Sequence, residues 1–234
     1  GNMSAHCLGW ERVKAKYPDL PMMLCSGGGG RSDYEALSYF TEFWPSDNTD
    51  PIERLFIQWG FSQVFPAKTM CAHVTTWNKN SSVKFRTDVA MMCKLGFDIK
   101  LADMSKDDET YCRTAVQNYN RLKPVVLEGD MYRLVSPYGS NHTSTMYVGK
   151  DKDKAVVFAF DIHPRYAEKT LPVRLQGLDA DKMYRVKEIN LMPGANSSLS
   201  GNGEVFSGEF LMNVGLNLFT TQQLNSRVVE VVAE

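Results

Sequence analysis

The sequence predicts an α/β fold in its first part and an all-β fold in its second, and three observations support this division. Short apolar runs near residues 21, 43, 69 and 97 are each followed by a stretch with helical periodicity. From about residue 140 this periodicity gives way to short runs rich in Val, Phe and Tyr, separated by turn residues. No low-complexity linker, internal repeat or heptad run interrupts the chain. We therefore expect half of a TIM (β/α)8 barrel at residues 1–139 and a small antiparallel β-sandwich domain at residues 140–234.

The first β/α unit ends in a glycine loop. An apolar run at residues 21–24 predicts a buried parallel strand, so Cys25 is expected at its carboxyl end. The glycines at residues 27–30 permit positive φ and a close backbone approach, and Ser32 with Glu35 predicts a capping box that opens a helix. A phosphate cradle is the alternative, but the loop lacks both a following Lys-Ser or Lys-Thr pair and GxGxxG spacing.

The second unit carries two acidic residues, and local sequence rules predict a different role for each. Asp50, Pro51 and Glu53 match the N-cap, N1 and N3 positions of an amphipathic helix, which explains Asp50 as a cap. Asp47 has no such structural duty and follows the aromatic residue Trp44, whose ring can exclude water. That environment suits a general acid, and the alternative is an Asx-turn residue in a polar loop.

Two further units complete the expected half barrel. A strand is predicted at residues 68–74, a helix at 86–95 stopped by Gly96, and another strand at 97–101. Ser105 is expected to begin a long helix that ends before Pro124. In the second part the pattern predicts strands at residues 146–148, 155–161, 173–178, 184–190, 205–213 and 228–232.

Composition and charge exclude several classes of function. The net charge of -1 gives no electrostatic attraction to nucleic acid or to anionic membranes, so neither is an expected partner. The 5 cysteines are odd in number and lack zinc-like spacing, and the 4 histidines are scattered, so we expect no disulfide scaffold, no metal and no cofactor. Thiol catalysis by Cys25 with His73 is a weak alternative, because no third orienting residue is evident.

The motifs together resemble the retaining α-galactosidases of the raffinose- and melibiose-hydrolysing family. The resemblance covers the Cys25–Arg31 loop, the Trp-Pro-Ser-Asp-Asn-Thr-Asp run at residues 44–50, the Ala-His-Val core of residues 70–74, and the closing β domain. It implies that Asp47 is the acid/base and that Cys25, Gly28 and Arg31 are substrate-binding residues, with Arg31 shaping the loop in which Cys25 and Gly28 help to hold galactose. Residues 32–35 depart from the usual pattern, which affects the expected loop shape more than the reaction type.

The resemblance also implies an incomplete catalytic pair. A retaining glycosidase needs two carboxyl groups about 5–5.5 Å apart. The family's nucleophile lies in a Lys-Trp-Asp type motif after the fourth barrel strand, and nothing similar occurs in these 234 residues. We therefore expect barrel strands five to eight with the terminal domain, from a protein whose natural amino terminus is missing, which leaves its localisation open.

The expected function is thus that of an α-galactosidase fragment. The parent enzyme would remove terminal α-linked galactose from oligosaccharides by double displacement, and this chain alone would be inactive. The alternatives are an α-N-acetylgalactosaminidase or galactosyl transferase on the same scaffold, or a non-catalytic sugar-binding or interaction module. Because half a barrel leaves strand edges unpaired, we also expect either a homo-oligomer or a loosely folded barrel half.

Overall fold

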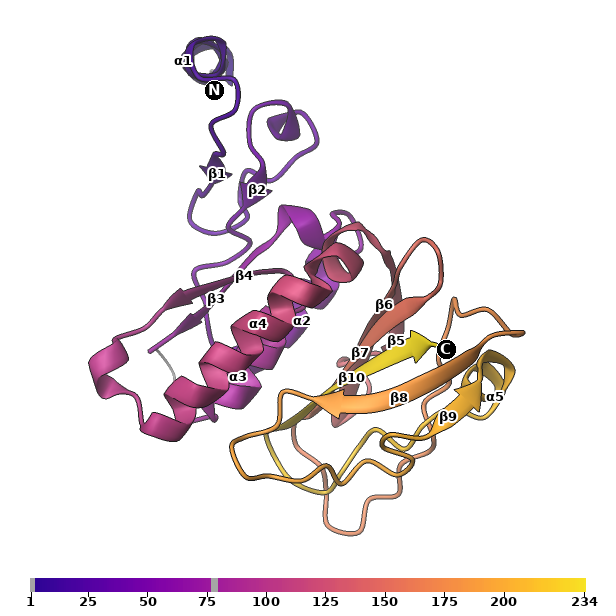
Figure 1. Ribbon diagram of the computed structural model, residues 1–234. Coiled ribbons are helices and arrows are strands. Elements are labelled where there is room, and N and C mark those ends of the chain that lie inside the picture. The colour runs from indigo at the N-terminus through magenta and orange to yellow at the C-terminus, as the bar shows by residue number, and fades with distance from the viewer. Residues whose placement is uncertain (1–2, 77–79) are drawn as a thin grey trace.

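The computed structural model describes residues 3–76 and 80–234 as two parts in contact (Figure 1). The first part contains α1 (Met3–Lys16), β1 (Met23–Leu24), β2 (Glu42–Phe43), α2 (Pro51–Phe61), β3 (Cys71–Thr75), α3 (Val83–Ala90), β4 (Lys94–Asp98) and α4 (Lys106–Glu128), with short 3-10 helices η1 (Ala36–Ser38), η2 (Ala67–Thr69) and η3 (Leu101–Asp103). The second contains β5 (Asp130–Val135), β6 (His142–Val148), β7 (Lys154–Asp161), β8 (Met183–Ile189), β9 (Val205–Ser207), α5 (Gly208–Asn213) and β10 (Asn225–Ala233).

The first part has the strand arrangement of half a β/α barrel. β1 pairs with β2 and β3 pairs with β4, both in parallel, and a parallel bridge between Phe43 and Met70 joins the two pairs. The strands therefore follow one another in chain order, and their carboxyl ends lie at one edge. Both the partial barrel and the antiparallel part that follows it are confirmed. None of the helices in the described residues is long and apolar enough to cross a membrane.

The two predicted helix caps with the clearest local signals are present. Asp50 Oδ1 accepts hydrogen bonds from the backbone N–H groups of Ile52 at 2.8 Å and Glu53 at 3.2 Å, with Pro51 in the first turn of α2. Ser105 Oγ accepts from the Asp108 N–H at 3.1 Å at the start of α4. Asp50 is therefore satisfied by its structural role, which leaves Asp47 as the acidic residue to explain.

The predicted capping box at Ser32 and Glu35 is wrong. The segment forms a turn followed by the short helix η1, and Asp33 Oδ1 accepts from the Ala36 N–H at 2.7 Å instead. Such a side-chain bond satisfies the backbone locally and competes with a full α-helix. The chain after the glycine loop is consequently compact but mostly irregular, and it returns to β2 within a few residues.

The predicted boundary between α3 and β4 is also wrong, because Gly96 does not end a helix. Ser82 caps α3 by accepting from the Phe85 N–H at 3.1 Å, and the helix stops at Ala90. Gly96 lies inside β4, directly opposite His73 of β3. A Cβ at Gly96 would lie 2.5 Å from the His73 ring, so the missing side chain makes room for that imidazole.

The long helix α4 continues through Pro124, where the sequence predicts its end. Proline removes one hydrogen-bond donor and strains the preceding turn. The helix nevertheless reaches Glu128, because Leu122, Val125 and Val126 continue its buried face. Tertiary packing therefore outweighs the local cost of the proline.

The antiparallel part is one six-stranded sheet with the order β5-β6-β7-β10-β8-β9. Both of its faces are buried, so it has two cores. One face contributes Phe158 and Phe160 to the core shared with α3 and α4, and the other contributes Val157 and Val229 to a core covered by α5 and neighbouring loops. Loops and a short helix thus occupy the place of a sandwich's second sheet.

The strands differ from their predicted positions mainly at the two ends of the sheet. β5 was not predicted, and it makes the sheet begin at Asp130, upstream of residue 139. Residues 173–178 form no strand of the sheet and make an isolated bridge from Val173 to Leu216, together with a backbone hydrogen bond from the Leu175 N–H to the Leu211 carbonyl at 2.9 Å. Residues 208–213 form α5 where strand was expected.

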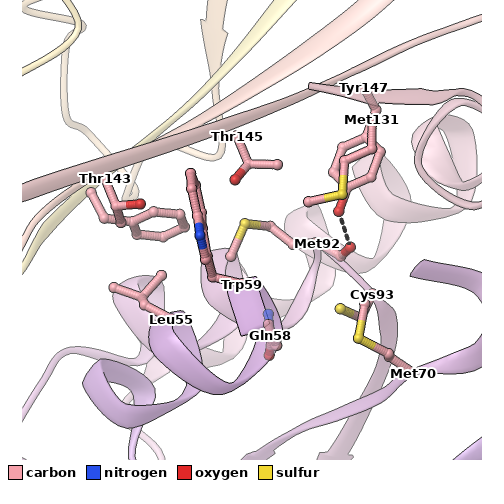
Figure 2. Close-up of a pocket in the computed structure, with 11 residues that line it drawn as sticks. Leu55, Gln58, Trp59, Met70, Met92, Cys93, Met131, Thr143, Thr145 and Tyr147 are labelled. Atoms are coloured by element: carbon pink, nitrogen blue, oxygen red, sulfur yellow. Dashed lines mark hydrogen bonds between the residues drawn. The ribbon is translucent and has the colours of Figure 1, made fainter. Parts of the chain in front are cut away.

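The interface between the two parts is closely packed. α3 and α4 lie between the parallel strands and the antiparallel sheet (Figure 1). Figure 2 shows Trp59 of α2 facing Thr143 and Thr145 of β6, beside the side chain of Met92. The cavity enclosed there is about 10 Å³, which is room for no more than a single water molecule. This interface is therefore part of the structure rather than a ligand site.

Candidate active site

The glycine loop and the Asp47 segment are in direct contact. The Gly29 N–H donates to the Pro45 carbonyl at 2.9 Å, and a Cβ on Gly28 would lie 2.9 Å from Ser46 Cα. Gly28 has φ +79, a conformation that L side chains rarely adopt. Two independent reasons therefore require glycine at residue 28, and the loop is held against the backbone that leads to Asp47.

Cys25 lies beside this contact. The Trp44 N–H donates to the Leu24 carbonyl at 2.9 Å, so β1 and β2 end next to each other and Cys25 is the first residue beyond β1. Its thiol-bearing side chain is exposed, whereas Cys71 and Cys93 are buried. Parallel strand ends thus bring Cys25, Gly28 and Asp47 to one edge of the half barrel.

Arg31 lies elsewhere in the same loop. With Trp10, Leu24 and Tyr39 it surrounds a cavity of about 30 Å³ next to α1. Within the described part of the chain, no interaction given by the structure joins Arg31 to Asp47. The contacts of Arg31 that the structure describes are therefore on the side of the loop next to α1.

Asp47 itself is exposed and is bonded to one aromatic residue. The indole Nε1 of Trp44 donates to Asp47 Oδ1 at 3.0 Å. Sequence reasoning treated Trp44 only as a ring that excludes water and missed its donor. The spacing of the two residues could have indicated this bond, because side chains three residues apart around a turn can place an indole N–H next to a carboxylate.

A buried arginine, Arg54, packs against Trp44. The guanidinium of Arg54 lies 5.7 Å from the centre of the Trp44 ring. It donates to the Cys71 carbonyl at 2.6 Å and to Gln58 Oε1 at 3.2 Å, while Gln58 donates to the Val89 carbonyl at 3.1 Å. Burial lowers the pKa of Arg54 from its ordinary value, yet an arginine remains charged at neutral pH. Sequence analysis missed this residue, although a cation and a Gln four residues apart in a mostly apolar helix were a visible signal.

His73 completes the support. Its ring packs edge-on against Trp44, with centroids 4.8 Å apart and an interplanar angle of 67°. Burial lowers the pKa of His73, Asp98 opposes this change, and the charge of Arg54 adds to it. The imidazole is therefore neutral near pH 7 and acts as a packing surface. No interaction given for the described residues pairs it with Cys25, so the structure lends no support to thiol catalysis.

Metal or cofactor ligands are not grouped in the described residues. Across the described ranges, no cluster of three or more His, Cys, Asp and Glu side chains has the arrangement of a metal site. The cysteines described, namely 25, 71, 93 and 112, are free thiols.

The fold and this edge define a class of protein. Parallel strand ends that gather polar side chains at one edge, followed by an antiparallel domain, are the architecture of a β/α-barrel protein with a C-terminal β domain. Two family models match the chain in the same order: Melibiase at residues 7–129 and the glycosyl hydrolase family 36 C-terminal domain at residues 142–231. The chain therefore belongs to glycoside hydrolase family 36 and corresponds to the C-terminal portion of an α-galactosidase.

Individual relatives agree with this assignment. "Alpha-galactosidase 2" of Hypocrea jecorina is 35% identical over 96% of this chain and 30% of its own length, and "Alpha-galactosidase 1" of Pediococcus pentosaceus is 32% identical over 88% and 27%. The galactosidase domain of the α-galactosidase-sucrose kinase AgaSK superposes with a TM-score of 0.85 at 30% identity, covering 96% of this chain and 30% of that one. The chain thus spans about 30% of the length of these relatives.

Solved structures also carry ligands. A variant of the family 36 α-galactosidase AgaA from Geobacillus stearothermophilus, solved in complex with raffinose, has a TM-score of 0.85 and 28% identity over 96% of this chain and 30% of its own. Another AgaA variant is solved in complex with stachyose.

Proposed function

We propose that this chain supplies the acid/base half of an α-galactosidase active site, with Asp47 as the acid/base residue. The observation that supports this assignment is the position of Asp47: it is exposed at the carboxyl edge of the parallel strands, beside Gly28, and carries a fixed indole bond. Asp50, its acidic neighbour, is already satisfied as a helix cap. Asp47 is therefore the carboxyl group of this segment that is available to a substrate.

In the proposed reaction Asp47 first gives its proton to the glycosidic oxygen as the bond to galactose breaks. A carboxylate nucleophile attacks the anomeric carbon and forms a covalent galactosyl intermediate. Asp47 then takes a proton from water, which releases the sugar and regenerates the acid. Cys25 and Gly28 would line the galactose pocket, and Arg31 would shape their loop from the side next to α1. The proposed substrates are terminal α-galactosides of the raffinose type. The AgaA variants solved in complex with raffinose and stachyose support this choice.

The nucleophile is proposed to lie outside these residues. Asp98 also ends a strand at this edge, but β3 separates β4 from β2. Strand spacing puts the ends of β2 and β4 about 10 Å apart, whereas a retaining pair needs about 5–5.5 Å. Asp98 therefore does not fit the nucleophile's place, and the 234-residue chain is expected to show no α-galactosidase turnover by itself.

The assignment is tested in a chimera in which this chain replaces the matching part of the Hypocrea jecorina relative. Asp47→Asn is expected to slow hydrolysis of raffinose at least 100-fold and to affect activated aryl α-galactosides much less, since these need little protonation. Asp50→Asn exchanges one good N-cap for another, so it serves as the matched control with nearly unchanged activity. If Asp50→Asn reduced activity more than Asp47→Asn, Asp50 would be the acid/base residue in place of Asp47. If the chain alone turned over substrate and lost that activity on Asp47→Ala, the proposal that the nucleophile lies outside these residues would be refuted.

A further inference from the structure

The bond between Trp44 and Asp47 constrains where a proton can reside. Indole nitrogen is a donor only, so Asp47 Oδ1 must act as an acceptor at 3.0 Å. A carboxylate meets this condition with either oxygen. A protonated carboxyl group meets it best when its proton is on Oδ2, because Oδ1 is then the carbonyl oxygen, which is a stronger acceptor than a hydroxyl oxygen.

The indole is itself fixed on two sides. The Arg54 guanidinium lies over the indole ring, 5.7 Å from its centre, and the His73 ring packs against the indole in a T-shaped arrangement with centroids 4.8 Å apart. Arg54 is 3% exposed, and its bond to the Cys71 carbonyl at 2.6 Å anchors it to β3. The ring therefore has little freedom to turn away from Asp47.

The same arginine holds the backbone immediately before Asp47. Its Nη1 donates to the Ser46 carbonyl at 3.3 Å, and Gly28 packs closely against Ser46 Cα. One buried cation thus fixes both the main chain that leads to Asp47 and the ring that binds its side chain. An exposed carboxyl group is usually free to rotate, and this arrangement restricts that rotation.

We propose that Trp44 is a positioning residue that directs the acid/base proton of Asp47 to Oδ2, with Arg54 and His73 holding the indole in place. The inference rests on the proposed role of Asp47. In the first step the Oδ2 proton passes to the glycosidic oxygen, which also keeps the electron pair of the breaking C–O bond while a carboxylate nucleophile from outside this chain bonds to the anomeric carbon. In the second step Oδ2 receives a proton from water as the water oxygen bonds to the anomeric carbon, and the bond between that carbon and the nucleophile breaks to restore its carboxylate. Oδ1 stays bonded to the indole throughout, so the same oxygen is presented in both steps.

The pairing is tested directly in the 234-residue chain by NMR. We expect the Trp44 indole N–H resonance to move with pH at the same midpoint as the Asp47 carboxyl carbon, and this movement to vanish in Asp47→Asn. Trp59 lies in the interface of Figure 2, away from Asp47, and its indole serves as the internal reference. If the Trp44 indole N–H resonance did not move with pH at the midpoint of the Asp47 carboxyl carbon, the proposal would be overturned.

Catalysis is tested in the chimera with Trp44→Phe, which keeps an aromatic ring against Arg54 and His73 but removes the donor. Loss of a bond to a charged group predicts a decrease in kcat for raffinose of roughly tenfold, little change in KM and a smaller change for activated aryl galactosides. Trp59→Phe, the same substitution outside the site, is expected to leave both substrates unaffected.

The outcomes separate this inference from the function on which it rests. If Asp47→Asn shows no dependence on the leaving group, the acid/base assignment fails, whatever Trp44 does. If Asp47→Asn shows that dependence and Trp44→Phe behaves like the unmodified chimera, the positioning role alone is refuted. A chimera that fails to fold leaves the NMR titration of the chain as the deciding measurement.

Discussion

Asp88 in α3 accepts a 2.7 Å hydrogen bond from the hydroxyl of Ser226 in β10, which lies 138 residues further along the chain. Lys84, Tyr111 and Asn190 donate to the same carboxylate at 2.6, 2.7 and 3.0 Å, and Asp88 is fully buried. Burial and the charge of Asp88 raise the pKa of the Tyr111 hydroxyl well above its ordinary value. The two parts of the chain are therefore joined by a buried polar group as well as by apolar packing.

Removing that carboxylate is expected to be severe. Asp88→Ala leaves the Lys84 ammonium and the Tyr111 hydroxyl without their acceptor, which predicts a loss of about 3–5 kcal/mol in the free energy of unfolding. Ser226→Ala removes one donor of four and should cost about 1 kcal/mol. Urea denaturation measures both. Asp107→Ala, at an exposed position in α4, is the control, and an equal loss there would contradict the proposed joining role of Asp88.

The cysteines are expected to differ sharply in reactivity. Burial raises the pKa of Cys71 to about 11 and that of Cys93 to about 12, whereas the Cys25 side chain is exposed. Since the thiolate is the reactive form, iodoacetamide at pH 8 should modify Cys25 at least about 100-fold faster than either buried thiol. Peptide mapping by mass spectrometry gives the three rates. Equal rates in urea provide the control, and rapid labelling of Cys93 in the folded chain would contradict the burial described.

The outer edge of β4 is expected to cause self-association. Beside it, Phe97, Ile99 and Leu101 face Val116 of α4 across a groove of about 600 Å³, and Leu101 is 74% exposed. Among the residues that the structure describes, no strand pairs with the edge of β4 that faces away from β3. Such an edge next to an exposed apolar groove favours pairing with a second copy. Sedimentation at micromolar concentrations should show a concentration-dependent oligomer.

A charge in the groove should reverse this association. Leu101→Lys is expected to give a monomer, while Leu171→Lys, at a leucine of the second part that is also largely exposed, should leave the oligomer intact. A chain that is strictly monomeric without substitution would show that the edge and groove do not attract a partner.

His73 is expected to make stability depend on pH in a defined direction. Burial lowers its pKa below the ordinary value of 6.5, so the unfolded chain binds this proton more readily than the folded chain. The stabilisation from neutral His73 is therefore complete above pH 6.5 and decreases as pH falls through the folded-state pKa. The difference in unfolding free energy between the unmodified chain and His73→Gln isolates this contribution, and an imidazole NMR midpoint at or above 6.5 would contradict it.

Short-range rules identified much of this molecule. The caps at Asp50 and Ser105 are readable because each is satisfied within three residues, and the order of strands and helices follows from apolar periodicity. The same reasoning separated Asp47 from Asp50 by assigning the second a structural duty. The motifs at residues 25–31 and 44–50 separately resemble those of α-galactosidases, and the family models confirm that resemblance.

Tertiary structure decided what depends on partners far apart in sequence. Gly96 was predicted to end a helix, but strand pairing places it against His73, and Pro124 remains helical because its neighbours are buried. The support of the candidate site is of this kind as well: Arg54 reaches the Cys71 carbonyl only after α2 has packed on β3. The sequence alone determined which residues carry reactive groups, whereas the packing of distant segments determined their orientation, because no local rule encodes contacts between them.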